Sequence, residues 1–263
     1  MSDLPRYKAL LVERRDRLLV ISFNRPEVLN AFGKVMHEEF VEALHFAAAD
    51  PASDVVMITG AGRAFSAGGD LARMEECIAD PREFEREAAD AKRIVFALLD
   101  IEKPVIARVN GHAVGLGATV ALLCDVVFAA ESAKIGDPHV KVGLVAGDGG
   151  AIIWPQLLGF ARAKEYLLTG ELIPAPRAAE IGLINHAVPD AELDARVDAF
   201  CRKLLDGATQ AIRWTKVTVN IELKRIAHAL MDPGIAYESL TQRSDDHRNA
   251  VKAMKAKISA RDA

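Results

Sequence analysis

Three short apolar runs, separated by segments with helical periodicity, place the strongest constraint on the fold. The runs are Val55–Thr59, Pro104–Val109 and Val126–Ala130, and their nearly continuous apolar character is typical of strands covered on both faces. Between them, Phe84–Leu99 and Leu116–Leu123 repeat apolar residues at the period of an α-helix. Strands that alternate with helices predict parallel strands joined by crossover helices, which is the α/β class.

The two ends of the chain follow other patterns. Near the N-terminus, Ala9–Glu13 and Leu18–Asn24 predict a hairpin, and an amphipathic helix is predicted over Lys34–Ala49. The last part of the chain is almost entirely helical, and its 3.6-residue period has no strand to pack on. We therefore expect a core domain over residues 1–200 and a helical section over residues 201–263 that covers the core or forms a subunit interface.

Composition narrows the classes of partner. The 263 residues carry 33 Lys and Arg against 37 Asp and Glu, and a net charge of -4 provides no basic field for nucleic acid or an anionic membrane. The start lacks the apolar core of a signal peptide, and no stretch has the length of a membrane span, so a cytoplasmic protein is expected. Cys77, Cys124 and Cys201 lack the spacing of a zinc site or a disulfide framework, which predicts buried thiols and no metal.

Three glycine-rich segments each follow an apolar run. They are Gly60–Leu71, Asn110–Gly117 and Val145–Ala151, and none has the spacing of a phosphate-binding loop. Glycine at such places lets a ligand approach the main chain, although a glycine that only turns the chain explains any one segment equally well.

Taken together, these segments and their surroundings resemble the crotonase (enoyl-CoA hydratase/isomerase) superfamily. The resemblance rests on five pieces in the order found in that family: NRPEVLNAF (Asn24–Phe32), AFSAGGDL (Ala64–Leu71), KPVIARVNGHAVGLG (Lys103–Gly117), CDVVFAAESAKIGDPHVKVGL (Cys124–Leu144), and LLTG with GLINHAV near Leu167 and Gly182. It implies a spiral of ββα turns with a C-terminal helical section, assembled as a homotrimer or a dimer of trimers.

The resemblance also implies where an acyl-CoA thioester would bind. Two backbone N–H groups, carried over by position to Gly69 and Leu116, would bind the thioester oxygen and stabilise an enolate. The second donor would open a short helix, whose N-terminus favours negative charge. The residues implied for the coenzyme A arm are Arg25, Val28, Asn30, Ala31, Ala67 and Asp70. Coenzyme A would enter as part of the substrate, with no separate cofactor.

The sequence departs from the hydratase pattern at two positions. Hydratases of this family carry a glutamate on the short helix and another after the glycine-x-proline turn, and here those positions hold Thr119 and His139. Threonine is not a general base at neutral pH, but an imidazole is, and Asp148 lies nine residues after His139, where it could orient the ring. Purely structural roles are the alternative: a histidine bonded to a loop carbonyl, and an aspartate that caps a helix.

Three functions follow. The first is a lyase of the enoyl-CoA hydratase/isomerase type, in which Gly69 and Leu116 form the oxyanion hole and His139, assisted by Asp148, is the base. The second is a retro-Claisen C–C hydrolase of a β-diketone or β-keto acyl substrate, because PHVKVGLVAGDGG resembles the corresponding stretch of the 6-oxocamphor hydrolase type. The third is an acyl-CoA-binding protein without activity. The sequence does not specify the acyl chain.

Overall fold

The computed structural model describes residues 4–262, and its larger sheet has six strands in the order β1-β2-β3-β5-β7-β10. These strands are β1 (Leu10–Arg15), β2 (Leu18–Phe23), β3 (Val55–Gly60), β5 (Val105–Val109), β7 (Val126–Ala130) and β10 (His186–Val188). β1 and β2 form the predicted antiparallel hairpin, and the neighbours from β2 to β10 are parallel. The predicted α/β class is confirmed.

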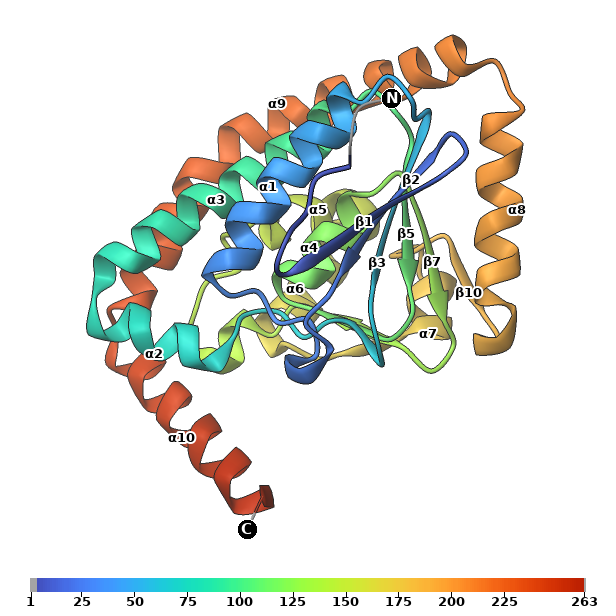
Figure 1. The fold of residues 1–263 in the computed structure, drawn as a ribbon. Coiled ribbons are helices and arrows are strands. Elements are labelled where there is room, and N and C mark those ends of the chain that lie inside the picture. The colour runs from blue at the N-terminus through green and yellow to red at the C-terminus, as the bar shows by residue number, and fades with distance from the viewer. Residues whose placement is uncertain (1–3, 263) are drawn as a thin grey trace.

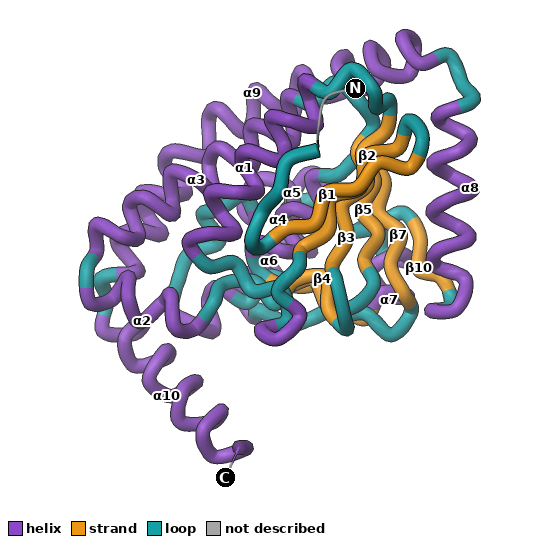
Figure 2. Tube along the Cα trace, in the orientation of Figure 1, coloured by secondary structure: helices purple, strands orange, loops and turns teal. Residues whose placement is uncertain are grey.

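Helices cover both faces of this sheet. They are α1 (Lys34–Ala49), α2 (Leu71–Ala79), α3 (Pro81–Asp100), α4 (Leu116–Leu123), α5 (Gly150–Leu158), α6 (Phe160–Thr169), α7 (Ala175–Glu180), α8 (Leu193–Leu205), α9 (Thr209–Gln242) and α10 (Asp245–Asp262). α8 lies along one face, and α1, α3 and α9 form layers on the other (Figure 1). The strands therefore form a single block enclosed by helices (Figure 2), which explains why every residue of β2 and β3 is buried.

A second, smaller sheet has strands too short to be predicted from periodicity. It has the order β4-β6-β8-β9, with β4 (Ala64–Ser66), β6 (His112–Val114), β8 (Lys134–Gly136) and β9 (Ile173–Pro174). β4, β6 and β8 follow β3, β5 and β7 along the chain, so three successive strands of the larger sheet each feed one short strand. The chain thus winds as a spiral, and the loops that leave the small sheet all lie at one end.

Four phenylalanine rings join the two sheets to α1. Phe23 of β2 contacts Phe32, Phe40 of α1 and Phe65 of β4 in edge-to-face pairs with centroids 5.1–5.3 Å apart. All four rings are fully buried, and such pairs add specific geometry to the area that they remove from water. The cluster fixes the chain at Phe32, which lies beside the glycine-rich loop after β4.

The C-terminal section consists of α8, α9 and α10, with a short break after α9. The expected boundary at residues 200 and 201 falls inside α8, whereas the chain leaves regular structure between Leu205 and Thr209. α9 packs on α3 and α5 and keeps large apolar side chains exposed, among them Trp214 and Leu240. The predicted trimeric assembly stays a prediction.

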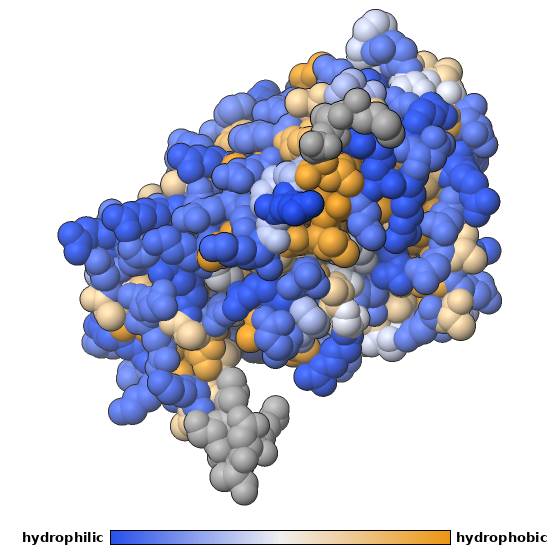
Figure 3. Space-filling view, in the orientation of Figure 1, coloured by the Kyte–Doolittle hydropathy of each residue, from blue (hydrophilic) through white to orange (hydrophobic). Residues whose placement is uncertain are grey.

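The surface drawn in Figure 3 is mostly hydrophilic, with apolar side chains gathered over the region of the edge strand β1. Within residues 4–262, no helix has both the length and the apolar character needed to cross a bilayer. The three cysteines are buried and unpaired, as the sequence predicted.

Replacing Phe23 by alanine should lower the free energy of unfolding by about 3–5 kcal/mol, because the cavity left at the centre of the ring cluster cannot collapse. Urea denaturation followed by circular dichroism measures this change. Leu11→Ala on β1, where the leucine is 47% exposed, is the matched control and should change stability by less than about 0.5 kcal/mol. Equal effects of the two substitutions would contradict the assigned core.

Candidate active site

One cavity brings together all four residues that the sequence predicted to carry the chemistry. It has a volume of about 70 Å³, and its wall includes Gly69, Leu116, His139 and Asp148. The rest of the wall is largely apolar and includes Phe84. A concave, mostly apolar pocket with a few converging polar groups is the usual form of a small-molecule site.

Two glycines allow the loop after β4 to touch the start of α4. A Cβ atom on Gly68 would lie 2.8 Å from the carbonyl oxygen of Val114, and the φ of Gly68 is 86°, a conformation that favours glycine. A Cβ atom on Gly117 would lie 2.6 Å from the Cβ of Ser66. Because a side chain fits at neither position, the two backbone segments are in direct contact.

Within residues 4–262, the backbone N–H groups of Gly69 and Leu116 donate no hydrogen bond. The residues around Gly69 are held by Phe32, whose N–H donates to the oxygen of Gly68 at 2.7 Å and whose oxygen accepts from Asp70 at 3.1 Å. Leu116 is the first residue of α4, where an N–H group has no intrahelical partner. Among residues 4–262 neither amide nitrogen has an acceptor, so both remain available to a ligand.

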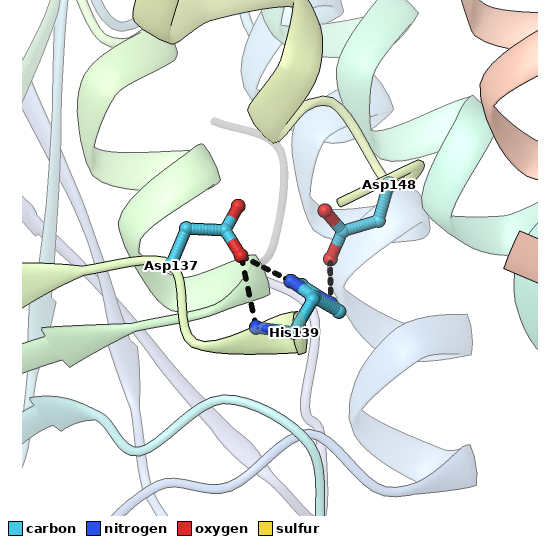
Figure 4. A group of neighbouring side chains, drawn as sticks. All are labelled: Asp137, His139 and Asp148. Carbon is cyan, nitrogen blue, oxygen red and sulfur yellow. Dashed lines mark hydrogen bonds and ion pairs between the residues drawn. The ribbon is translucent and has the colours of Figure 1, made fainter. Parts of the chain in front are cut away.

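His139 lies between two aspartates. Its Nδ1 is hydrogen-bonded to Asp137 Oδ1, and its Nε2 lies 3.3 Å from Asp148 Oδ2 (Figure 4). Asp137 comes from the turn after β8, His139 begins a short 3-10 helix (His139–Val142), and Asp148 comes from the loop before α5. The carboxylates therefore approach opposite edges of the ring. Asp148 lies beside the imidazole as predicted, but it contacts Nε2. Asp137 contacts Nδ1, the nitrogen that a group orienting a catalytic histidine usually binds.

The three side chains form an ionic group that is almost closed to water. Burial by itself lowers the pKa of His139, but the charges and hydrogen bonds of Asp137 and Asp148 outweigh it and raise that pKa well above 6.5. Burial favours a raised pKa for Asp148, but the imidazole beside it holds that pKa below its usual range. The raised pKa of His139 and the lowered pKa of Asp148 both favour an imidazolium paired with the Asp148 carboxylate.

α5 explains how two buried carboxylates are tolerated here. Asp148 immediately precedes Gly149, the N-cap of this helix, and a Cβ on Gly150 would lie 1.9 Å from Asp137 Oδ2. Both carboxylates thus lie at a helix N-terminus, whose amides and dipole favour negative charge. Asp148 is not itself the cap, since that position belongs to Gly149.

Glu238 is a further carboxyl group on the cavity wall, in addition to Asp148 and Glu87. Glu238 of α9 places Oε1 3.9 Å from His139 Nε2. α9 comes this close because two glycines meet: a Cβ on Gly147 would lie 2.3 Å from the oxygen of Gly234. Burial first, and then the charge of Asp148, raise the pKa of Glu238 well above its usual range.

Asp137, His139 and Asp148 offer ligand atoms within 4.8 Å of one another, as a metal site would require. The two carboxylates, however, approach opposite nitrogens of one ring. A shared ion would have to replace the hydrogen bonds that the ring now makes, so the arrangement fits two N–H protons better than a metal.

Of the six residues predicted to contact coenzyme A, Arg25 and Asp70 line an adjacent groove, and the other four are joined to them along the chain or through hydrogen bonds. Arg25 donates to the oxygen of Ala31 at 2.9 Å and pairs with Asp70 at 3.2 Å, and its own N–H donates to the Asn30 side chain. Ala31 in turn donates to Val28, and Ala67 donates to Leu29. The structure therefore brings the six residues together. The groove also contains Lys8 and Lys34, and it adjoins the cavity at Gly69 and Asp70.

Sequence reasoning missed Asp137 and Glu238. Asp137 was within reach, because it stands two residues before His139 in a stretch already singled out. Glu238 carries no signal in the sequence, since it is one of three acidic residues on a long helix and belongs to no motif. Only the contact between Gly147 and Gly234 places it at the cavity.

Comparison with known proteins gives a consistent picture. The family model described as enoyl-CoA hydratase/isomerase matches residues 13–260. A crotonyl-CoA hydratase of Syntrophomonas wolfei is 37% identical over 216 residues, which cover 81% of this chain and 82% of that protein.

Solved structures agree with this result. A crystal structure of an enoyl-CoA hydratase/isomerase from Mycobacterium paratuberculosis has a TM-score of 0.90 and 39% identity, and the match covers 96% of this chain and 100% of that one. A β-diketone hydrolase from Anabaena has a TM-score of 0.83 and 31% identity over 90% of this chain and 95% of that one. The expected spiral fold with a C-terminal helical section is confirmed.

His139 should keep its second proton well above pH 6.5, because loss of that proton would leave two buried carboxylates without a cation. Nitrogen-15 NMR of the ring nitrogens measures this titration. The contribution to stability is fully present below pH 6.5 and is lost as the pH rises through the raised pKa of the folded protein. Asp137→Asn should lower the pKa of His139. Titration of the wild-type ring near pH 6.5 would refute the ionic arrangement.

Proposed function

The chain belongs to the enoyl-CoA hydratase/isomerase family, and from this membership we propose that it forms and discharges the enolate of an acyl-CoA thioester, in the addition or removal of water. The observation that carries the proposal is the pair of amides of Gly69 and Leu116. Both line one cavity, and neither has an acceptor among residues 4–262. Two such donors suit an oxygen on which negative charge develops.

The amides would act on the thioester oxygen. As the α-carbon loses a proton, or the β-carbon gains an oxygen, charge moves onto this atom and its hydrogen bonds strengthen. Each main-chain donor is worth about 3 kcal/mol in comparable oxyanion holes. The N-terminus of α4 adds a favourable dipole.

The adjacent groove supports a CoA ester as the form of the substrate. Lys8, Arg25 and Lys34 would face the phosphates of coenzyme A, and the groove reaches the cavity at Asp70, next to the Gly69 amide. An acyl group attached through a long carrier could then enter the cavity while its carrier stays in the groove. Coenzyme A is thus part of the substrate.

His139 and Asp148 would handle the proton of the water. The sequence-based hypothesis gave the role of base to the imidazole, assisted by Asp148. Since the ring already carries two protons at neutral pH, we assign the accepting atom to the carboxylate of Asp148, with the imidazolium as its partner. Thr119 and His139 stand where hydratases carry glutamates, but Asp148 still supplies a carboxylate to this cavity.

A retro-Claisen C–C hydrolase is the second candidate. It is supported by the similarity to the β-diketone hydrolase from Anabaena and by the 3.3 Å separation of His139 and Asp148, a pair that could direct water at a carbonyl. Incubation with a cyclic β-diketone distinguishes the candidates. A keto acid product formed by the wild type and lost in Asp148→Asn would favour the hydrolase, and its absence would leave the acyl-CoA enzyme.

Leu116→Pro should reduce enolate formation by about 100- to 1,000-fold, because it removes one N–H donor at the first position of a helix, where proline is tolerated. The measurement is incorporation of deuterium from D₂O at the α-carbon of acetyl-, butyryl- and hexanoyl-CoA, followed by mass spectrometry.

Leu116→Ala is the matched control, since it loses side-chain packing but keeps the amide. It should retain most of the exchange, and both variants should keep the circular dichroism of the wild type. Exchange by Leu116→Pro at the rate of Leu116→Ala, or no exchange by the wild type with any of the three thioesters, would contradict the proposal.

A further inference from the structure

We infer that Glu238 is a further catalytic residue, which exchanges a proton with the α-carbon of the acyl group while Asp148 takes the proton of the water. The inference rests on the proposed function and assigns its second proton-transfer group. Glu238 belongs to the C-terminal helical section, far along the chain from every motif that identifies the family.

The position of Glu238 is built by close packing. Gly147 and Gly234 meet so tightly that a Cβ on Gly147 would lie 2.3 Å from the oxygen of Gly234 and 2.8 Å from Glu238 Oε2. Pro233, directly before Gly234, removes one hydrogen bond from α9 at the same point. The helix is therefore adapted to approach the loop that carries Asp148, and the approach brings the carboxyl to the cavity wall.

The carboxyl group of Glu238 is buried, but the described residues make no hydrogen bond to it. Its side chain is 8% exposed, and among residues 4–262 no hydrogen-bond donor or acceptor contacts either oxygen. Within the described part of the chain, the one charged nitrogen within 4.0 Å of this carboxyl is His139 Nε2 at 3.9 Å, beyond hydrogen-bond distance. Because Glu238 lines the cavity, its carboxyl group is available to a ligand bound there.

The charges of the site favour a neutral carboxyl here. Asp137 and Asp148 together already exceed the charge of the single imidazolium, so a third ionised carboxyl would add a further unpaired negative charge. Burial, and then Asp148, raise the pKa of Glu238 accordingly, whereas the pKa of Asp148 is lowered. One carboxylate and one carboxylic acid at a single cavity make an acid–base pair.

In the addition of water to an enoyl-CoA, two protons move between the substrate and the side chains of the site. Water forms a C–O bond at the β-carbon and gives a proton to the Asp148 carboxylate, and the electron pair of the C=C bond moves onto the thioester oxygen at the two amides. The enolate then collapses, and its α-carbon takes the proton of Glu238. The proton on Asp148 returns to Glu238 through His139 Nε2, which restores the starting state.

In the reverse direction, the ionised form of Glu238 removes the α-proton of a saturated acyl-CoA. Exchange at this carbon should therefore rise with pH as Glu238 ionises. Other titratable groups line the same cavity from each neighbouring element: His139 after β8, Asp148 before α5, His37 on α1, Cys77 on α2, Glu87 on α3 and His247 on α10. Asp137 contacts the His139 ring without lining the cavity.

The test is deuterium exchange at the α-carbon of butyryl-CoA, together with hydration of crotonyl-CoA. Glu238→Gln, which preserves the size of the side chain, should lose at least about 100-fold in both reactions. Asp148→Asn should lose hydration but keep exchange within about tenfold of the wild type. Glu222→Gln is the matched control on the same helix, where the side chain is 70% exposed, and it should leave both rates unchanged.

The outcomes separate this inference from the proposed function. Exchange by the wild type that persists in Glu238→Gln with the same pH profile overturns the role of Glu238 and leaves enolate formation standing. No exchange by the wild type overturns both. If Glu238→Gln does not fold, Glu238→Asp provides the test: a carboxyl displaced by one methylene should shift the pH profile of exchange, and an unshifted profile overturns the inference.

Discussion

The site depends on direct contact between two stretches of main chain. The loop after β4 and the first turn of α4 touch at Gly68 and Gly117, where the carbonyl of Val114 and the side chain of Ser66 leave no room for a Cβ. Phe32 holds this loop from the other side through two hydrogen bonds, and the ring cluster beneath fixes Phe32 in turn. The orientation of the free amides therefore follows from packing that begins in the core.

Much of this arrangement could be predicted from the sequence, and the reasons are physical. α1, α4 and β7 begin and end at the residues that periodicity indicated, because each has an apolar face or run with clear limits. The small sheet was not predicted, since two or three residues are too few to alternate. Lys34–Ala49 illustrates the first case, and Ile173–Pro174 illustrates the second.

The family resemblance predicted Gly69 and Leu116 as main-chain donors, whereas the side chains around them are known only from the structure. Asp148 was expected beside His139, and it lies there, yet on the other nitrogen from the one an orienting group would hold. Thr119, which replaces a family glutamate, lies 3.5 Å from the carboxylate of Asp148. A carboxylate thus occupies nearly the same region of the cavity from a different element. Neither periodicity nor a local motif in the sequence can show that a carboxylate from one element replaces a carboxylate from another.

The main-chain origin of the two donors has an evolutionary consequence. Any residue except proline can replace Leu116 without removing its N–H group, so substitution rarely removes the donor that we propose for the oxyanion. The groups that we propose for proton transfer, in contrast, are side chains on separate elements: the turn after β8, the loop before α5, and α9. Under this proposal, single codon changes there would alter which bond reacts while the two main-chain donors are kept, so the type of reaction can change without rebuilding the scaffold.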